Sequence, residues 1–109
     1  MNCIFCKIIK KEIPAGIVFE NKDIIAFKDV NPIAPVHVLV IPKKHIISVA
    51  DASDDDVLLM GKLIMVAKKI AEDLKISNKG YKLLVRVGKG GGQEVGHLHL
   101  HLLGGAYNV

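Results

Sequence analysis

The sequence has no tryptophan, only two cysteines and no long uninterrupted apolar run. Aromatic residues make up 5% of the chain, which argues against a platform of rings that stacks on nucleic acid bases. No segment approaches the roughly 18 consecutive apolar residues that span a bilayer, and residues 1–14 mix apolar with basic side chains, unlike a signal peptide. We therefore expect a cytoplasmic protein that binds neither nucleic acid nor membrane. Its two cysteines are then reduced or metal-bound.

What the sequence does contain is enough apolar material for one modest core. Half of the 109 residues are hydrophobic, so we expect a single domain over residues 1–109. The formal net charge of +4 suits an anionic ligand. The lysines occur singly or in pairs, however, and do not form the basic stripe typical of nucleic-acid-binding proteins.

The hydrophobic patterns predict an α+β fold. Short strand-like runs occur at residues 17–20, 24–30, 36–42, 81–87 and 97–103. Residues 3–11 suit a short helix, and a long helix is expected to begin at a cap on Ser53 or Asp54. Its apolar residues at helical spacing are Val57, Met60, Ile64, Ala67, Ala71 and Leu74. Because most strand connections are short, the prediction is a five-stranded, mainly antiparallel sheet with one long helix.

Three of the five histidines stand on alternate residues of GHLHLHLLGG, residues 96–105. On a strand this alternation sends the leucines toward one face and His97, His99 and His101 toward the other. Three interpretations are open at this point. In the first, the histidines occupy a solvent-exposed face, and in the second they form a catalytic metal site. In the third, they divide their roles among a nucleophile, a phosphate contact and a structural ligand.

A glycine-rich segment, residues 88–96, precedes the histidines and lacks the Walker pattern of a P-loop. It is either a flexible hairpin loop or a nest of backbone amides that binds an anion. A hairpin about it places Arg86, the only arginine, opposite residues 97–99, where a guanidinium could reach a phosphate. This combination favours phosphoryl or nucleotidyl transfer over metal-assisted peptide hydrolysis.

HLHLHLL, residues 97–103, resembles the signature of the histidine triad (HIT) family. Residues 8–46 and 91–105 resemble the branch of purine nucleoside phosphoramidases and histidine triad nucleotide-binding proteins. The resemblance implies a hydrolase acting on purine nucleotides, as conjugates of AMP or GMP. It also implies a homodimer in which the long helix and a sheet edge pair to give a ten-stranded sheet.

The resemblance assigns the chemistry to three histidines. His99 corresponds to the nucleophile, which attacks the α-phosphorus to form a nucleotidyl-histidine intermediate. His101 corresponds to the residue that contacts the phosphate or leaving group, and His37 to a supporting histidine. Two alternatives stay open: a dinucleoside polyphosphate hydrolase of the same family, and a zinc-stabilised nucleotide-binding adaptor with incidental turnover.

The same resemblance implies the substrate contacts. Asp29 and Val30 correspond to ribose-contacting positions, and Gly92, Gln93 and Glu94 to the phosphate loop. Base-pocket positions, which are equally compatible with ordinary core, are Phe5, Ile8, Phe27 and Leu39. Arg86 departs from the asparagine usual in the phosphoramidase branch, Gly96 replaces a frequent tyrosine, and the tail at 106–109 is short. These departures bear on substrate selectivity.

A second constellation consists of Cys3, Cys6, His45 and His97. By composition it is a Cys2His2 set suited to tetrahedral zinc, although a lone C-x-x-C is also compatible with a redox pair or with two buried apolar residues. Many bacterial and archaeal family members, and the galactose-1-phosphate uridylyltransferases, are similar in this respect and bind zinc. We expect a structural zinc ion and no organic cofactor.

Overall fold

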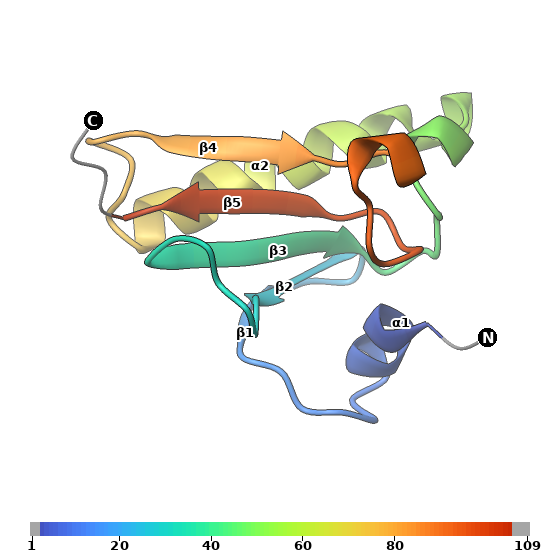
Figure 1. The fold of residues 1–109 in the computed structure, drawn as a ribbon, viewed down its shortest axis with the longest axis horizontal. Helices are drawn as coiled ribbons and strands as arrows, with labels where there is room; N and C mark the ends of the chain where they lie inside the picture. Colours follow the sequence, from blue (N-terminus) through green and yellow to red (C-terminus); the bar gives the residue numbers. More distant parts are fainter. Residues whose placement is uncertain (1–2, 106–109) are drawn as a thin grey trace.

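The computed structural model describes residues 3–105, so the short tail at 106–109 lies outside the described residues. The five strands form one sheet in the order β1-β2-β3-β5-β4, and every neighbouring pair is antiparallel (Figure 1). The strands are β1 (Ile17–Glu20), β2 (Ile24–Lys28), β3 (Val36–Pro42), β4 (Tyr81–Val85) and β5 (Leu100–Gly104). The predicted α+β fold with a five-stranded antiparallel sheet is confirmed.

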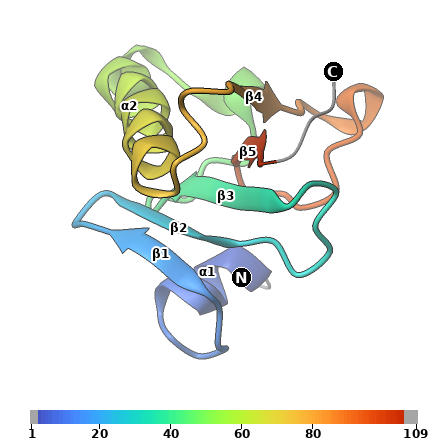
Figure 2. The same cartoon turned by 90° about the vertical axis from the view of Figure 1, so that its left-hand side faces the viewer.

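Two helices lie on opposite faces of this sheet. The long helix α2 (Val57–Asp73) crosses one face, and the short helix α1 (Ile4–Ile9) lies by the other, near β1 and β2 (Figures 1 and 2). Side chains of β2, β3 and β5 pack against α2 in one hydrophobic cluster, and a second cluster joins α1 to β2 and β3. Because β2 and β3 are covered on both faces, they are almost continuously apolar in sequence.

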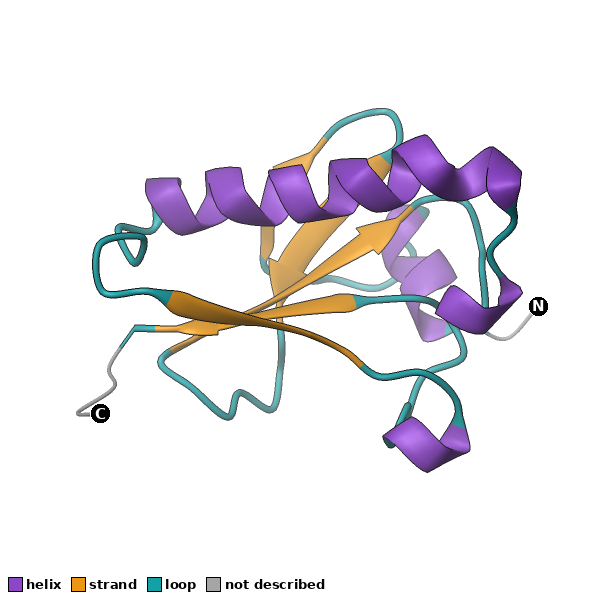
Figure 3. Cartoon of the chain, turned by 90° about the horizontal axis from the view of Figure 1, so that it is seen from above, coloured by secondary structure: helices purple, strands orange, loops and turns teal. Residues whose placement is uncertain are grey.

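The segment that leads into helix α2 begins at a capping box. The hydroxyl of Ser53 accepts a hydrogen bond from the amide of Asp55, and the carboxylate of Asp56 accepts one from the amide of Ser53. A short 3-10 turn, Asp54–Asp56, leads from this cap directly into α2, seen from above in Figure 3. Of the two caps considered, Ser53 caps this turn, whereas the residue directly before α2 is Asp56, whose side chain makes no cap hydrogen bond to α2. No helix among residues 3–105 is both long enough and apolar enough to cross a bilayer.

The predicted buried stripe of α2 is only partly correct. The buried residues are Leu63, Ala67, Ile70 and Ala71, whereas Val57 is 64% exposed and Ile64 46% exposed. The helix carries apolar residues around most of its circumference, so periodicity alone could not select the face that meets the sheet.

Several predicted element ends are also wrong. The predicted strand 97–103 begins only at Leu100, because its neighbour β3 ends at Pro42, which has no amide hydrogen to extend the ladder. The amide of Leu98 donates instead to the carbonyl of Ile46. The strands predicted at 24–30 and 81–87 end two residues early, and the first helix covers Ile4–Ile9 within the predicted 3–11.

Candidate active site and metal centre

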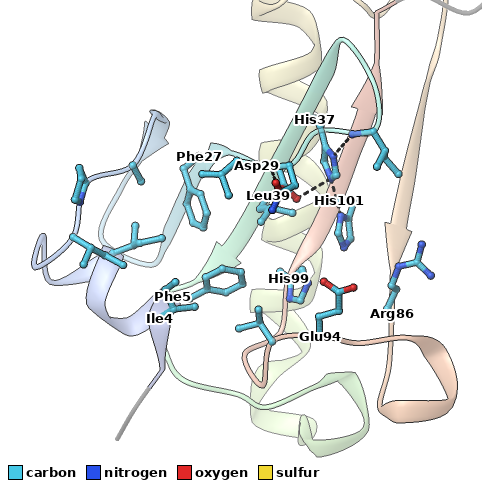
Figure 4. A pocket seen from close by; sticks show the side chains of 18 of the residues that line it. Ile4, Phe5, Phe27, Asp29, His37, Leu39, Arg86, Glu94, His99 and His101 are labelled. Atoms are coloured by element: carbon cyan, nitrogen blue, oxygen red, sulfur yellow. Dashed lines mark hydrogen bonds and ion pairs between the residues drawn. The ribbon is translucent and has the colours of Figure 1, made fainter.

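A cavity of about 840 Å³ opens on the face of the sheet that α1 partly covers. Figure 4 shows Phe5 and Phe27 on one side of His99, and Glu94 and Arg86 on the other. The cavity therefore has an apolar wall and a charged wall, with histidines between them. Of the residues expected at the substrate site, those that line it are Phe5, Ile8, Phe27, Asp29, Val30, His37, Leu39, Arg86, Gly92, Glu94, His99 and His101.

The sheet register brings the histidines of two strands together. In the β3–β5 ladder Leu39 lies opposite His101 and His37 lies opposite Leu103. His37 and His101 are thus diagonal neighbours on one face, and their ring centroids are 5.2 Å apart. The ring of His99 lies 5.0 Å from that of His101. The alternation predicted for the histidine row holds, although His97 and His99 precede the strand.

The tautomer of His99 follows from its hydrogen bond. Its Nδ1 lies 2.7 Å from the backbone carbonyl oxygen of His97. A carbonyl oxygen only accepts, so Nδ1 carries the hydrogen and Nε2 keeps a free lone pair. The ring of Phe5 packs edge-on against His99, with centroids 5.2 Å apart and an interplanar angle of 87°. This buried imidazole therefore has a fixed orientation and one nucleophilic nitrogen.

The tautomers of His37 and His101 follow in the same way. The amide of Ile33 donates to His37 Nδ1 at 3.1 Å, so the hydrogen of His37 is on Nε2. That hydrogen points to His101 Nδ1, 2.9 Å away, and leaves the hydrogen of His101 on Nε2. Within residues 3–105 this Nε2 is the buried side-chain nitrogen without a hydrogen-bond partner. An unpaired buried donor is costly, so it is well placed to meet an acceptor on a ligand.

Burial keeps both of these histidines neutral. Burial, together with His99, His37 and Arg86, lowers the pKa of His101 to about 4. Burial likewise lowers the pKa of His37, and the nearby carboxylate of Asp29 opposes that shift in part. At neutral pH the pair therefore acts as a chain of neutral hydrogen-bond donors.

Asp29 belongs to this network. Its Oδ2 lies 3.3 Å from His37 Nε2, and its Oδ1 accepts a hydrogen bond from the amide of Asn31. Asp29, His37 and His101 bring three potential metal ligands within 4.8 Å of one another. However, the amide of Ile33 fixes the hydrogen of His37 on Nε2, which faces the other two groups. We therefore interpret these three residues as a hydrogen-bond network.

The glycine-rich loop is held in shape by Gln93. Its side-chain amide donates to the carbonyls of Ile47 and Val95, at 2.6 and 2.9 Å, and its Oε1 accepts from the amide of Gly88. Gln93 was expected to contact substrate, but its side chain is engaged in these three bonds and it is absent from the cavity lining. Arg86 lines the cavity and donates to the carbonyl of Gly91 at 3.4 Å.

The four residues of the expected metal site converge. Cys3 Sγ lies 3.4 Å from His97 Nδ1, Cys6 Sγ lies 3.3 Å from His45 Nδ1, and the two Nδ1 atoms are 3.1 Å apart. Ideal zinc–ligand bond lengths give tetrahedral edges of about 3.4 Å between nitrogens and about 3.6 Å between sulfur and nitrogen. His97 Nε2 donates to the carbonyl of Pro42 at 2.8 Å, so its Nδ1 lone pair faces the cluster. The donor set fits zinc.

Sequence reasoning missed several lining residues, one at the start of α1 and the others in loops, where no periodic pattern marks which side chains turn inward. These residues are Ile4, Ile13, Pro14, Ala15, Asn31, Ile33 and Val95. Ile33 matters most, since its amide sets the tautomer of His37. Two prolines flank it, at positions 32 and 35, and were the only local signal of a fixed loop there.

An antiparallel sheet with a cavity that contains paired neutral histidines is an arrangement suited to histidine-based chemistry. The HIT domain family model matches residues 10–108, and the chain belongs to this family. Protein HitA of Neisseria gonorrhoeae is 50% identical over 103 residues, which are 94% of this chain and 95% of that protein. The purine nucleoside phosphoramidase of Escherichia coli (strain K12) is 47% identical over 102 residues, 94% of this chain and 86% of that protein.

Among solved structures, a HIT family hydrolase from Legionella pneumophila Philadelphia 1 is similar, with a TM-score of 0.95 and 53% sequence identity. The match covers 99% of this chain and 96% of that one. These relatives place the chain among the HIT family hydrolases.

Proposed function

We propose that this protein hydrolyses purine nucleoside phosphoramidates or related nucleotidyl conjugates at the α-phosphorus. The observation that carries the proposal is the pairing of two tautomers in one cavity: His99 presents a lone pair at Nε2, and His101 presents a hydrogen at Nε2. A nucleophile beside an unpartnered donor suits attack on a phosphorus whose oxygens accept hydrogen bonds. The 47% identical relative named a purine nucleoside phosphoramidase supports this substrate class.

In the proposed reaction, His99 Nε2 attacks the α-phosphorus and the bond from phosphorus to the leaving nitrogen or oxygen breaks. The imidazole then carries hydrogen on Nδ1 and phosphorus on Nε2, and is therefore cationic. The carbonyl oxygen of His97 stabilises that charge through the existing hydrogen bond. The Nε2–H group of His101 donates a hydrogen bond to the phosphate or to the departing atom, and the departing amine or alcohol takes its proton from solvent. Water subsequently cleaves the nucleotidyl-histidine and releases the nucleoside monophosphate.

The rest of the cavity suits the nucleoside. The apolar wall formed by Phe5, Ile8, Phe27 and Leu39 offers two aromatic rings, whose centroids are 5.4 Å apart, to a planar base. The carboxylate of Asp29 can accept hydrogen bonds from ribose hydroxyls, with Val30 beside it at the rim. A cavity of about 840 Å³ also leaves room for a leaving group beside Gly92, Glu94 and Arg86.

The test is a turnover panel on wild type and His99→Ala, with an adenosine phosphoramidate, a guanosine phosphoramidate, a diadenosine polyphosphate and a sugar nucleotide. We expect His99→Ala to lose turnover while AMP affinity stays within about tenfold, or 1.4 kcal/mol, because the side chain forms the covalent bond. Lys79→Ala, at an exposed position outside the cavity, is the control. Near-normal kcat of His99→Ala on every substrate would refute the covalent mechanism.

Two alternatives have specific support. A dinucleoside polyphosphate hydrolase is favoured by Arg86, a cation at the end of the cavity where further phosphates would lie. A nucleotide-binding adaptor would share the cavity but accumulate no intermediate. Rapid-quench trapping of a labelled nucleotidyl adduct on His99 separates the adaptor from both enzymes, and the panel separates the enzymes from each other.

We further propose that Cys3, Cys6, His45 and His97 hold a structural zinc ion, because their four ligand atoms lie within 4.8 Å of one another.

A second copy of the chain is the proposed partner for the exposed apolar residues of α2. The largest of these are Val57, Leu58, Ile64 and Met65. Strand β4 is an edge of the sheet, so pairing with a second β4 would give the ten-stranded sheet.

A further inference from the structure

Helix α1 is joined to the sheet by side chains. The backbone hydrogen bonds of residues 3–12 stay within that segment, such as Lys7 to Cys3 and Glu12 to Lys7. Two kinds of side-chain contact therefore connect α1 to the rest of the chain beside the cavity. Cys3 and Cys6 reach His45 and His97 in the metal cluster, and Phe5 packs into the apolar cluster with β2 and β3.

Phe5 lies between the metal cluster and the nucleophile. It stands between the two cysteines in sequence, and its ring packs edge-on against both His97 and His99, at centroid distances of 5.9 and 5.2 Å. The same ring contacts Phe27 at 5.4 Å and lines the cavity. A shift of α1 would therefore have two effects at once. It would move a wall of the cavity, and it would remove the ring contact that supports His99.

His97 connects the two sites a second time. Its ring contributes Nδ1 to the cluster, while its backbone carbonyl fixes the hydrogen of His99 on Nδ1 at 2.7 Å. Residues 95–99 lie outside the strand ladder. The amide of Leu98 donates a hydrogen bond to the backbone carbonyl of Ile46, which follows the metal ligand His45 in the sequence. The position of the His97 carbonyl thus depends on the cluster.

We infer that the metal cluster is a positioning element for catalysis, so that zinc and nucleotide bind cooperatively. The link runs through the His97 carbonyl to His99 and through Phe5 to the apolar wall. This inference rests on the proposed function, because it takes a nucleotide as the ligand of the cavity. Since coupling between sites is reciprocal, zinc must tighten AMP binding by the same factor by which AMP tightens zinc binding.

The direct test is zinc release from the loaded protein, which needs no folded zinc-free form; the two measurements after chelation are made at a temperature where circular dichroism shows the zinc-free protein to be folded. Zinc release into excess chromogenic chelator is timed with and without saturating AMP. We expect AMP to slow release about tenfold, within the usual range of coupling between sites. The AMP dissociation constant, measured by calorimetry before and after chelation, should rise by a similar factor. In imidazole NMR, the His99 Nδ1–H resonance should broaden or disappear on chelation.

Two variants separate positioning from general stabilisation. Ser53→Ala removes the cap of the 3-10 turn before α2, and Ser53 is neither a member of the metal cluster nor a residue that lines the cavity. If zinc escaped only through global unfolding, this variant would speed release about fivefold; we expect no change. Phe5→Leu keeps the four ligands but loses the ring contacts, so AMP should slow release by less than threefold.

Three outcomes decide the matter. If AMP binds the loaded protein but leaves the zinc release rate unchanged, the inference is wrong and the proposed function stands. A release rate in Ser53→Ala that rises with its instability would also overturn the inference. If the loaded protein fails to bind AMP at all, the proposed function fails first.

Discussion

The three histidines of the triad differ because different atoms fix their second ring nitrogens. The carbonyl of Pro42 holds a hydrogen on His97 Nε2, whereas the carbonyl of His97 holds one on His99 Nδ1. His37 donates to His101 Nδ1 and so leaves the hydrogen of His101 on Nε2. One sequence pattern therefore yields three different rings: His97 turns an Nδ1 lone pair toward the cysteines, His99 keeps a lone pair on Nε2, and His101 carries a hydrogen on Nε2.

The lowered pKa values of His101 and His37 predict how stability depends on pH. The unfolded chain binds protons at these positions below about pH 6.5, while folded His101 binds its proton only near pH 4. Their contribution to the free energy of unfolding is therefore complete above pH 6.5 and is lost progressively as pH falls toward 4. Denaturant unfolding between pH 7.5 and 4.5 measures this decline.

The matched variant is His101→Gln, which removes one of the two titrating groups. Its stability should fall less steeply than that of the wild type over the same pH range, whatever its stability at pH 7.5. Parallel pH curves for the two proteins would show that the folded structure does not hold His101 neutral.

Arg86 gives a prediction about substrate preference. A fixed cation at the cavity should favour substrates with additional negative charge over a simple phosphoramidate. Arg86→Asn should therefore lower kcat/KM on a diadenosine polyphosphate more than on an adenosine phosphoramidate. Lys89→Asn, in the same loop but outside the cavity lining, is the charge-matched control. Equal losses on both substrates would mean that Arg86 does not face the leaving group.

At this scale the sequence predicts which residues gather but not how each is used. The alternation of histidines and leucines is enough to expect a shared face, because the period of a strand is two. Gln93 shows the limit: a polar residue in a glycine-rich loop suits phosphate contact, yet three hydrogen bonds engage its side chain. One of these bonds depends on the position of the Ile47 carbonyl, which is distant in sequence.

At the scale of elements, the entry into α2 depends on the capping box of the 3-10 turn before it. Ser53→Ala removes the acceptor for the amide of Asp55 and should lower the free energy of unfolding by about 1 kcal/mol. Denaturant unfolding measures the change, and turnover of folded protein should be unaffected. Ser77→Ala, an exposed serine in the turn after α2, should change stability little. A comparable loss in both variants would contradict the assigned cap.

The zinc centre is the second element-scale prediction, because it ties α1 and the segment after β3 to the start of the catalytic strand. Chelation should lower the melting temperature by about 10 °C or more, since metal binding energy contributes to folding. Cys3→Ser/Cys6→Ser should melt at a similarly low temperature and contain no stoichiometric zinc.

Metal analysis of natively purified protein decides the assignment. If the protein contains no zinc, the two cysteines are interpreted as residues of the hydrophobic core. Zinc that survives His97→Ala but is lost in His99→Ala would instead make the histidine row a catalytic metal site, and the covalent mechanism would fail with it.

Elements were predicted better than their ends and faces. Strand alternation and turn residues were sufficient for the number of strands and their places along the chain, whereas the order of strands within the sheet was not predicted. The sequence pattern was not sufficient for the buried face of α2, because Val57 and Ile64 extend an apolar surface that one chain leaves exposed. A sequence pattern shows that a residue is apolar, but it does not show whether the same chain or a second molecule covers that residue.

At the scale of the whole molecule, the two sheet edges differ. Strand β1 has four residues and an irregular register with β2, both of which discourage pairing with another strand. Strand β4 has five regularly paired residues and exposes Val85 beside the apolar surface of α2. A free edge next to an exposed apolar helix face favours association through α2 and β4.

The last prediction therefore concerns Leu58, which is 78% exposed on α2. Leu58→Glu should convert a dimer into a monomer at micromolar concentration in light scattering, because an interface of about 800 Å² per partner tolerates no unpaired charge at its centre. Lys22→Ala, in the β1–β2 turn, is the control. It changes the net charge by the same amount as Leu58→Glu and should leave the dimer intact. Since Arg86 follows β4 directly, the monomer should lose more kcat/KM on a polyphosphate than on a phosphoramidate. A wild-type protein that remains monomeric at high micromolar concentration would refute the homodimer.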